Sequence, residues 1–187
     1  MCSKCYETLE HLPVKVNRII DGKRVYCAGV YEKNLQKLIR GLKYHKQRDL
    51  AFYLAKFMFE YWQEITQEKG FEVIPVPIFK TREKKRKYNH MTLVGEEFCK
   101  LSDNVLNYEL IKRVKDTKPQ YKLSKKERAQ NLLGAFKADK SKLITGKILL
   151  IDDICTTGST FEEMIKELNK AGITDITCLA ATTPFED

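Results

Sequence analysis

The sequence predicts an α/β protein with a mainly parallel sheet flanked by helices. Short apolar runs of strand length alternate along the chain with segments whose apolar residues recur at helical spacing, which is typical of this class. Polar segments directly follow several of the apolar runs, and in a parallel sheet such segments gather at the carboxyl edge. The 187 residues suffice for one domain with its own core, which we expect at residues 32–187, after an N-terminal appendage at residues 1–31.

The appendage is predicted to contain a small β-hairpin. Residues 14–20 and 23–31 have the composition of strands, and Asp21-Gly22 between them is a strong signal for a two-residue hairpin turn.

The rest of the chain is predicted to alternate between helices and strands. In residues 34–44, apolar residues recur at i, i+3, i+4 and i+7, and residues 50–65 are rich in large apolar side chains, which indicates a buried helix. A capping box, Ser124-x-x-Glu127, marks the start of a later helix. The remaining predictions are strands at residues 71–76, 105–114, 134–136, 147–151 and 174–181, helices at 89–101, 124–131 and 159–169, and a charged loop at 79–87.

The composition indicates an anionic partner. The net charge is +9, from 34 Lys and Arg against 25 Asp and Glu, which suits a phosphorylated sugar as well as DNA or RNA. No apolar run approaches membrane-spanning length, and the N-terminus lacks a signal-peptide pattern. We therefore expect a soluble, cytoplasmic protein without membrane insertion.

One pair of cysteines has the spacing of a metal site. Cys2-Ser-Lys-Cys5 is half of a zinc-knuckle pattern, and His11 and Cys27 would have to complete a tetrahedral site. Zinc at Cys2 and Cys5 is therefore a hypothesis. Cys155 stands among hydroxyl-bearing residues, and we assign it no nucleophilic role.

Residues 148–160 carry the most informative pattern. A buried strand ends at two adjacent acids, Asp152 and Asp153, and a small-residue turn then leads into a helix, so that backbone N–H groups converge where a phosphate would fit. Gly158 lets the backbone approach a ligand closely. The acids can accept hydrogen bonds from sugar hydroxyls and hold a cation such as Mg²⁺. Further donors are the hydroxyls of Thr156, Thr157, Ser159 and Thr160.

This pattern predicts a ribose-5-phosphate site. It resembles the phosphoribosyl pyrophosphate (PRPP) motif of type I phosphoribosyltransferases over residues 148–160. We expect the helix to open at Ser159 or Thr160, with Glu162 and Glu163 placed for a capping box.

Two basic segments are predicted to lie over that site. The first follows the strand at residues 71–76, and its Arg82 and Arg86 could clamp a pyrophosphate bidentately. The second runs from Arg113 to Phe136, is long for a connection, and is predicted to include a mobile lid at about residues 115–126. The candidate lid residues are Arg113, Thr117, Gln120, Arg128 and Asn131.

Four segments together resemble the ComF family of competence-associated phosphoribosyltransferase-like proteins. They are Ile39-x-x-Leu42-Lys43-Tyr44, the Val76-Pro77 turn with Arg82-x-x-x-Arg86-x-x-Asn89, the Arg113 to Phe136 pattern and the PRPP motif. The resemblance implies a type I phosphoribosyltransferase fold and transfer of ribose-5-phosphate from PRPP, with Mg²⁺-pyrophosphate leaving. It also implies a role in DNA uptake and natural transformation, with DNA-uptake proteins as partners.

The chain departs from the family pattern at two places. Where the family commonly has Arg-Gly-Phe-Asn-Gln, this sequence has Arg86-Lys87-Tyr88-Asn89-His90. The family usually begins with a four-cysteine zinc module, of which only Cys2 and Cys5 remain here. In addition, purine-salvage relatives carry an aspartate where Thr156 stands, so purine salvage is disfavoured.

Two further interpretations stay open. In one, the chain is a competence factor that binds single-stranded DNA or partner proteins without turnover, with Tyr44, Tyr88 and Tyr121 as stacking groups. In the other, it is a PRPP-responsive regulator. The sequence leaves open whether catalysis occurs and names no firm catalytic residue.

Overall fold

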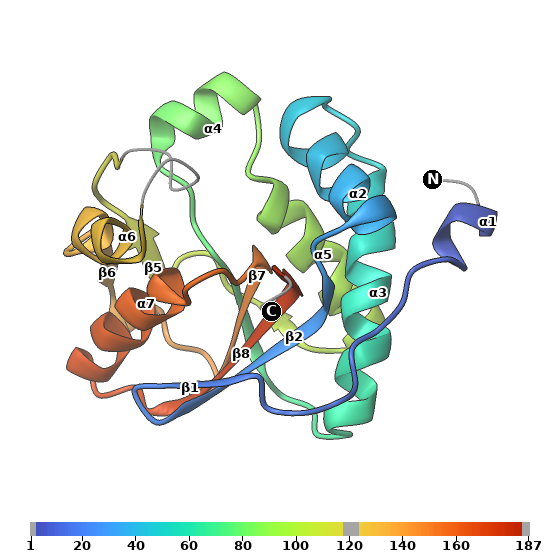
Figure 1. The fold of residues 1–187 in the computed structure, drawn as a ribbon. Coiled ribbons are helices and arrows are strands. Elements are labelled where there is room, and N and C mark those ends of the chain that lie inside the picture. Colours follow the sequence, from blue (N-terminus) through green and yellow to red (C-terminus); the bar gives the residue numbers. More distant parts are fainter. Residues whose placement is uncertain (1–2, 118–123, 185–187) are drawn as a thin grey trace.

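The core of the molecule is a six-stranded sheet with the order β1-β2-β8-β7-β3-β4 (Figure 1). The computed structural model describes residues 3–117 and 124–184. Among these residues, only β1 runs antiparallel to its neighbour in the sheet, so the predicted mainly parallel sheet is confirmed. The strands are β1 (Arg18–Ile20), β2 (Lys23–Val30), β3 (Glu72–Pro75), β4 (Val105–Leu106), β7 (Lys147–Ile154) and β8 (Asp175–Thr183).

Helices flank this sheet on both faces, and a small second sheet lies at one side (Figure 1). The second sheet pairs β5 (Ile111–Arg113) with β6 (Phe136–Ala138) in antiparallel fashion. The helices are α1 (Ser3–Tyr6), α2 (Lys33–Tyr44), α3 (Leu50–Ile65), α4 (Lys80–Arg86), α5 (His90–Ser102), α6 (Lys125–Leu132), α7 (Ser159–Lys170) and the 3₁₀ helix η2 (Lys140–Lys142).

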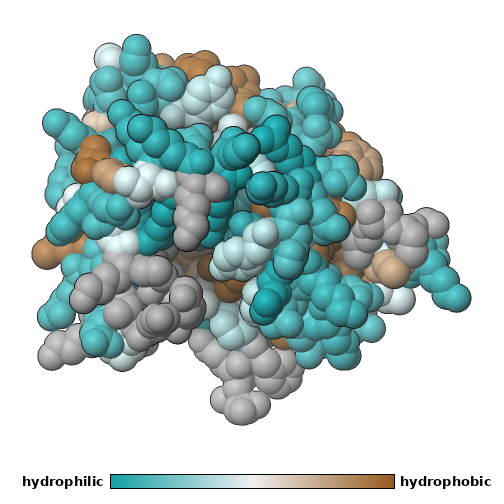
Figure 2. Space-filling model, turned by 90° about the horizontal axis from the view of Figure 1, so that it is seen from above, coloured by the Kyte–Doolittle hydropathy of each residue, from teal (hydrophilic) through white to brown (hydrophobic). Residues whose placement is uncertain are grey.

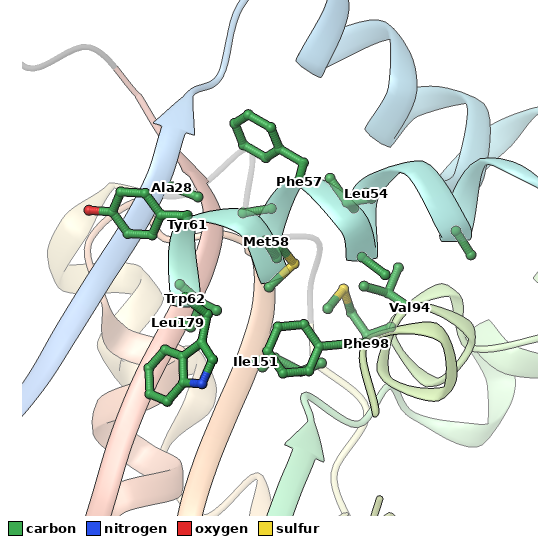
Figure 3. Close-up of a cluster of buried hydrophobic side chains, with 14 of the residues drawn as sticks. Ala28, Leu54, Phe57, Met58, Tyr61, Trp62, Val94, Phe98, Ile151 and Leu179 are labelled. Atoms are coloured by element: carbon green, nitrogen blue, oxygen red, sulfur yellow. The ribbon is translucent and has the colours of Figure 1, made fainter. Parts of the chain in front are cut away.

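Each face of the sheet has its own hydrophobic core. Along β7, Leu149 and Ile151 pack with α2, α3 and α5, whereas Ile148 and Leu150 pack with α7 and the small sheet. This alternation follows from the two-residue period of a strand, and it explains why β7 is apolar without interruption. Figure 3 shows the first of these cores, in which Trp62 and other side chains of α3 lie against α5 and the sheet.

The strand order reverses between β3 and β7. From β3 the chain passes through α5 to β4 on one side, and from β7 it passes through α7 to β8 on the other. Parallel sheets bind ligands where the strand order reverses in this way, outside the carboxyl ends of the strands. The segments that follow β3 and β7 at this edge are α4 and the turn at residues 155–158. Figure 2 looks down on this edge, and most of the exposed surface there is hydrophilic.

The predicted N-terminal hairpin is confirmed, although β1 begins at Arg18 rather than at residue 14. Asp21 and Gly22 both have positive φ angles, +47° and +75°, as a two-residue hairpin turn requires. Residues of β2 pair with β8 from Arg24 to Val30, so the hairpin forms part of the central sheet. The division of the chain at residue 31 stays a prediction.

Two element predictions were wrong in part. Residues 80–86 form helix α4 instead of a loop, because lysine, arginine and glutamate favour helices and a run of charge does not prevent one. The single strand predicted at residues 105–114 is two strands, β4 and β5, which belong to different sheets. The capping box at Ser124 and Glu127 is confirmed. Within the described residues, no helix is long and apolar enough to cross a membrane.

Candidate ligand site at the carboxyl edge of the sheet

The acidic pair lies at the end of β7 and is anchored there by β8. The backbone N–H of Cys155 donates to the carbonyl of Thr182 at 2.8 Å, and the Thr182 hydroxyl donates to the carbonyl of Asp153 at 2.9 Å. Thr182 is fully buried. The strand therefore stays regular up to the acids, and the chain can turn only after them.

The turn that follows presents backbone donors. In the described part of the chain, the N–H groups of Thr156, Thr157 and Gly158 donate to no protein acceptor. The Thr157 and Ser159 hydroxyls lie 2.8 Å apart, and Gly158 has a φ of +81° at the N-cap of α7. Unsatisfied N–H groups next to a helix N-terminus form a cradle for an anionic oxygen.

The capping box expected for α7 was wrong. The N-cap is Gly158, which has no side chain, so Ser159 and Thr160 are already inside the helix. Glu163 is buried and accepts a hydrogen bond from the N–H of Gly134 at 2.6 Å, and Glu162 pairs with Lys166. The two acids thus serve tertiary and surface contacts, which leaves the donors of the turn open to a ligand.

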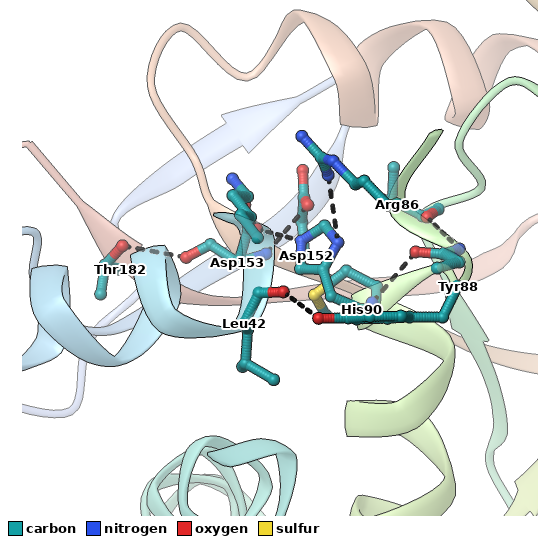
Figure 4. A network of polar contacts seen from close by, with 11 residues as sticks. Leu42, Arg86, Tyr88, His90, Asp152, Asp153 and Thr182 are labelled. Atoms are coloured by element: carbon teal, nitrogen blue, oxygen red, sulfur yellow. Dashed lines mark hydrogen bonds and ion pairs between the residues drawn. The ribbon is translucent and has the colours of Figure 1, made fainter. Parts of the chain in front are cut away.

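Asp153 is enclosed by two protein groups (Figure 4). Its Oδ2 lies 2.6 Å from Nζ of Lys43, at the end of α2, and 2.5 Å from Nε2 of His90, the first residue of α5. The side chain of Asp153 is only 6% exposed and that of His90 only 4%. Helices α2 and α5 are therefore both tied to the end of β7 through one carboxylate oxygen.

The protonation states follow from this enclosure. Burial by itself would raise the pKa of Asp153, but the Lys43 ammonium and His90 lower it below its ordinary value. Burial would lower the pKa of Lys43, and Asp153 raises it. The pKa of His90 is lowered by burial, and Lys43 and Arg86 lower it further against the effect of Asp153. A neutral His90 then donates from Nε2 to Asp153, and Nδ1 accepts from Arg86 at 3.4 Å.

Asp152 differs from its neighbour. It is partly exposed, and its Oδ1 accepts a hydrogen bond from the backbone N–H of Asp153 at 2.9 Å. Its pKa is raised well above the ordinary value, first by burial and then by the charge of Asp153. Of the predicted acidic pair, Asp152 is the more accessible member.

The two arginines of the first basic segment, Arg82 and Arg86, contact different parts of the molecule. Arg86, near the end of α4, reaches His90, and its guanidinium lies 5.5 Å from the ring centroid of Tyr44, which is 60% exposed. Arg82, one turn earlier, donates to the carbonyl of Thr117. The two arginines that were predicted to act together therefore approach the site from different sides.

Arg113 joins Arg82 at Thr117. Arg113 is buried, donates to the Thr117 hydroxyl and lies over the Phe136 ring at 5.3 Å, while its Nε has no hydrogen-bond partner among the described residues. Burial and the charge of Arg82 lower the pKa of Arg113 to about 10, against the attraction of Asp152. Two neighbouring guanidinium groups beside an acidic turn form a cationic cluster that an anion would stabilise.

Of the other predicted site residues, some lie on α6 and some lie outside the described residues. Arg128 and Asn131 lie half-buried on α6, which packs against α7. The residues that the structure does not describe include Cys2, Gln120 and Tyr121. Residues 118–123 of the expected lid are also outside the described residues, so the lid stays a prediction. Tyr88 was wrong as a stacking group, because it is buried and its hydroxyl donates to the carbonyl of Leu42 at 2.6 Å.

The zinc hypothesis stays a prediction. Cys5 is exposed on α1, and His11 packs on Phe57 with a ring distance of 4.2 Å and contacts its carbonyl at 2.8 Å. Cys27 is buried in the sheet. Among the described residues, no group of three or more His, Cys, Asp or Glu side chains could hold a metal ion.

Sequence reasoning placed neither Lys43 nor His90 in the PRPP site. Lys43 stands inside the Leu42-Lys43-Tyr44 segment of the family pattern, and His90 was noted only as a departure from it. A lysine in the last turn of an amphipathic helix is usually solvated. Only the packing of α2 against the end of β7 shows that this lysine pairs with a buried acid.

The fold and the site define an α/β protein whose hydroxyl-rich turn follows an acidic pair, Asp152 and Asp153, at the switch point of a mainly parallel sheet. The chain belongs to the competence protein F (ComF) family. It is 32% identical over 159 residues to "Competence protein F" of Haemophilus influenzae, an alignment covering 82% of this chain and 69% of that protein. The "DNA utilization protein YhgH" of Salmonella typhimurium is 24% identical over 193 residues, and that of Escherichia coli O157:H7 is 25% identical over 193 residues, each covering 97% of this chain and 84% of the relative. No family model matches the chain.

Proposed function

We propose that this chain binds PRPP at residues 152–160, with a type I phosphoribosyltransferase-like fold, and acts in DNA uptake. The observation that carries the proposal is the turn from Thr156 to Gly158, which lies next to the partly exposed Asp152 and whose backbone N–H groups donate to no acceptor among the residues that the structure describes. A phosphate and a sugar diol, held side by side, require that combination of donors and an acceptor. The names of the relatives, which refer to competence and DNA utilization, support the cellular role.

Three groups of residues would each bind a different part of PRPP. The 5-phosphate would lie on the turn and on the hydroxyls of residues 156–160. The ribose hydroxyls would donate to Asp152. The pyrophosphate would lie toward Arg82 and Arg86, with Arg113 beside Arg82. A dissociating pyrophosphate needs positioning and charge stabilisation more than proton transfer, which such a set of cations can provide.

Magnesium enters this proposal only as part of the substrate, Mg²⁺-PRPP. A metal bound by both acids does not fit the residues present, because Oδ2 of Asp153 already contacts Lys43 and His90. No step is therefore assigned to a protein-bound metal ion.

Calorimetric titration with PRPP, with and without Mg²⁺, tests the proposal. Asp152→Asn is the informative variant, because Asp152 is accessible, whereas loss of Asp153 would leave Lys43 buried without its partner. The variant should bind PRPP roughly tenfold or more weakly, since one side-chain oxygen that can accept from the diol becomes an NH₂ group, which only donates. Asp103→Asn, on an exposed residue after α5, is the control. Equal PRPP affinity in all three proteins, or none in the wild type, would refute the site.

A second candidate, binding of single-stranded DNA, has one observation in its favour. Tyr44 exposes its ring next to the guanidinium of Arg86, and an exposed aromatic with an adjacent cation suits base stacking. Tyr44→Ala should then weaken DNA binding at low salt, and Tyr108→Ala, another exposed tyrosine, should not. PRPP binding without pyrophosphate release would favour the third candidate, a PRPP-responsive regulator.

A further inference from the structure

We infer that Lys43 takes the place of a metal ion at the acidic pair, so that Asp153 is a structural carboxylate and the sugar diol is recognised by Asp152. The inference rests on the proposed function for the identity of the sugar, a ribose 5-phosphate. The exclusion of a metal ion from Oδ2 of Asp153 rests on the contacts of that oxygen alone.

The position of Lys43 is fixed by packing. Leu38, Ile39 and Leu42 are buried in the core beneath α2, and the carbonyl of Leu42 accepts the hydroxyl of Tyr88 at 2.6 Å. The next residue, Lys43, extends over the end of β7, with only 17% of its side chain exposed. Figure 4 shows Leu42, Tyr88, His90 and the acids in this arrangement.

The contacts leave no room for a metal on the shared oxygen. Oδ2 of Asp153 receives Lys43 Nζ at 2.6 Å and His90 Nε2 at 2.5 Å. Mg²⁺ demands octahedral geometry with oxygen ligands at about 2.0–2.1 Å, and it would have to displace both donors. An ammonium at this distance also repels an approaching divalent cation.

Charge balance supports the same assignment. The ionised Asp153 and the protonated Lys43 neutralise one another inside the protein, and the neutral His90 satisfies the same oxygen by hydrogen bonding. The ammonium group of Lys43 therefore neutralises the negative charge of the buried Asp153 carboxylate, as a divalent cation would. Asp152, whose Oδ1 accepts only a backbone N–H in the described contacts, remains for the hydroxyls of the sugar.

This arrangement predicts that Mg²⁺ affects the binding of ribose 5-phosphate and of PRPP differently. Ribose 5-phosphate has no pyrophosphate, so its binding should be indifferent to Mg²⁺. Any effect of Mg²⁺ on PRPP would then arise from the pyrophosphate alone.

The test uses Lys43→Met and Mn²⁺ as a paramagnetic probe. Electron paramagnetic resonance should detect no stoichiometric Mn²⁺ binding to the wild-type protein without ligand. Lys43→Met should bind Mn²⁺ roughly tenfold or more tightly than the wild type, because changing a residue that contacts a metal ligand typically alters metal affinity by at least that factor. Lys112→Met is the control, because Lys112 pairs with Glu109 at 2.6 Å on an exposed surface. Lys43→Met should also bind ribose 5-phosphate more weakly than wild type without metal and recover with millimolar Mg²⁺.

Two measurements keep the inference testable if Lys43→Met folds poorly. Added Mg²⁺ should raise the melting temperature of Lys43→Met and leave that of the wild type unchanged, because a ligand stabilises only the state that binds it. Stoichiometric Mn²⁺ binding by the wild type that is lost in Asp153→Asn would overturn the inference, whatever the variant does. Failure of the wild type to bind ribose 5-phosphate would count against the proposed function instead and leave the metal result intact.

Discussion

Gly158 and Ile20 are in direct contact, so the N-terminal hairpin packs against the turn of the candidate site. A methyl group added at Gly158 would lie 2.4 Å from Cδ1 of Ile20, and the backbone of Gly158 has a φ of +81°. The backbone conformation therefore favours glycine there, and an added methyl group would in addition force the end of the Ile20 side chain to shift. The hairpin, which belongs to a segment distant in the sequence, supports the shape of the turn.

Gly158→Ala should lower the free energy of unfolding by ~3 kcal/mol, from left-handed backbone strain together with overpacking against Ile20. Gly146→Ala is the matched control, because Gly146 has a φ of +85° and nothing within 4 Å of the added methyl. It should cost only ~1 kcal/mol, the backbone contribution alone. Urea unfolding of both variants measures the difference, and equal losses would show that the contact with Ile20 is unimportant.

Lys87→Gly should stabilise the protein by ~1 kcal/mol, since Lys87 adopts a left-handed conformation that glycine takes without penalty. Its φ is +69° at the C-cap of α4, where the family commonly has glycine, and its side chain is exposed. Lys84→Gly, on an exposed residue inside α4, should instead destabilise by a similar amount. The two changes should move the urea midpoint in opposite directions; a loss of stability in both would show that the α4 cap is not strained.

His90→Gln should remove a pH dependence of stability. The pKa of His90 is lowered in the folded protein, whereas in the unfolded chain it is about 6.5. Below pH 6.5 the unfolded chain therefore binds a proton that the folded protein does not bind. Stability of the wild type should therefore fall as the pH decreases from 6.5, at a slope of up to ~1.4 kcal/mol per pH unit. Asp153, whose pKa is also lowered, acts in the same direction only below a pH of about 3.9.

Glutamine keeps a donor for Asp153 but does not titrate, so His90→Gln should have a flatter profile between pH 6.5 and 5. His45→Gln, on an exposed histidine, should retain the wild-type profile. Urea unfolding at pH 7.5, 6.5, 5.5 and 5.0 provides the comparison. An unchanged slope in His90→Gln would mean that another group causes the pH dependence.

Arg113→Met should weaken PRPP binding by roughly one to two orders of magnitude, through loss of charge-assisted hydrogen bonds to the pyrophosphate. The melting temperature of the free protein should be unchanged or higher, because Arg113 is buried beside Arg82 and its Nε has no partner within the described part of the chain. Lys112→Met, on the neighbouring exposed residue of β5, should change neither quantity. A marked fall in melting temperature with unchanged PRPP affinity would assign Arg113 a structural role.

Local patterns predicted most of the elements. The i, i+3, i+4 and i+7 spacing placed α2, and the Asp21-Gly22 dipeptide placed the hairpin turn, because both signals arise from contacts between close neighbours in the sequence. The charged segment of α4 was misjudged, since solvation and helix formation are compatible in such a sequence. The strand at 105–114 was misjudged because pairing partners, which decide where a strand ends, lie elsewhere in the chain.

The sequence by itself determined the class of fold, the family resemblance and the acidic, hydroxyl-rich turn at residues 152–160. Which of the two acids remains accessible was decided only by tertiary structure. Lys43 and His90 come from helices far from β7 in the sequence, and both reach the same oxygen of Asp153. Alternation along a strand places adjacent side chains on opposite faces, so two identical residues meet different neighbours, and burial with a cation distinguishes one carboxylate from the other.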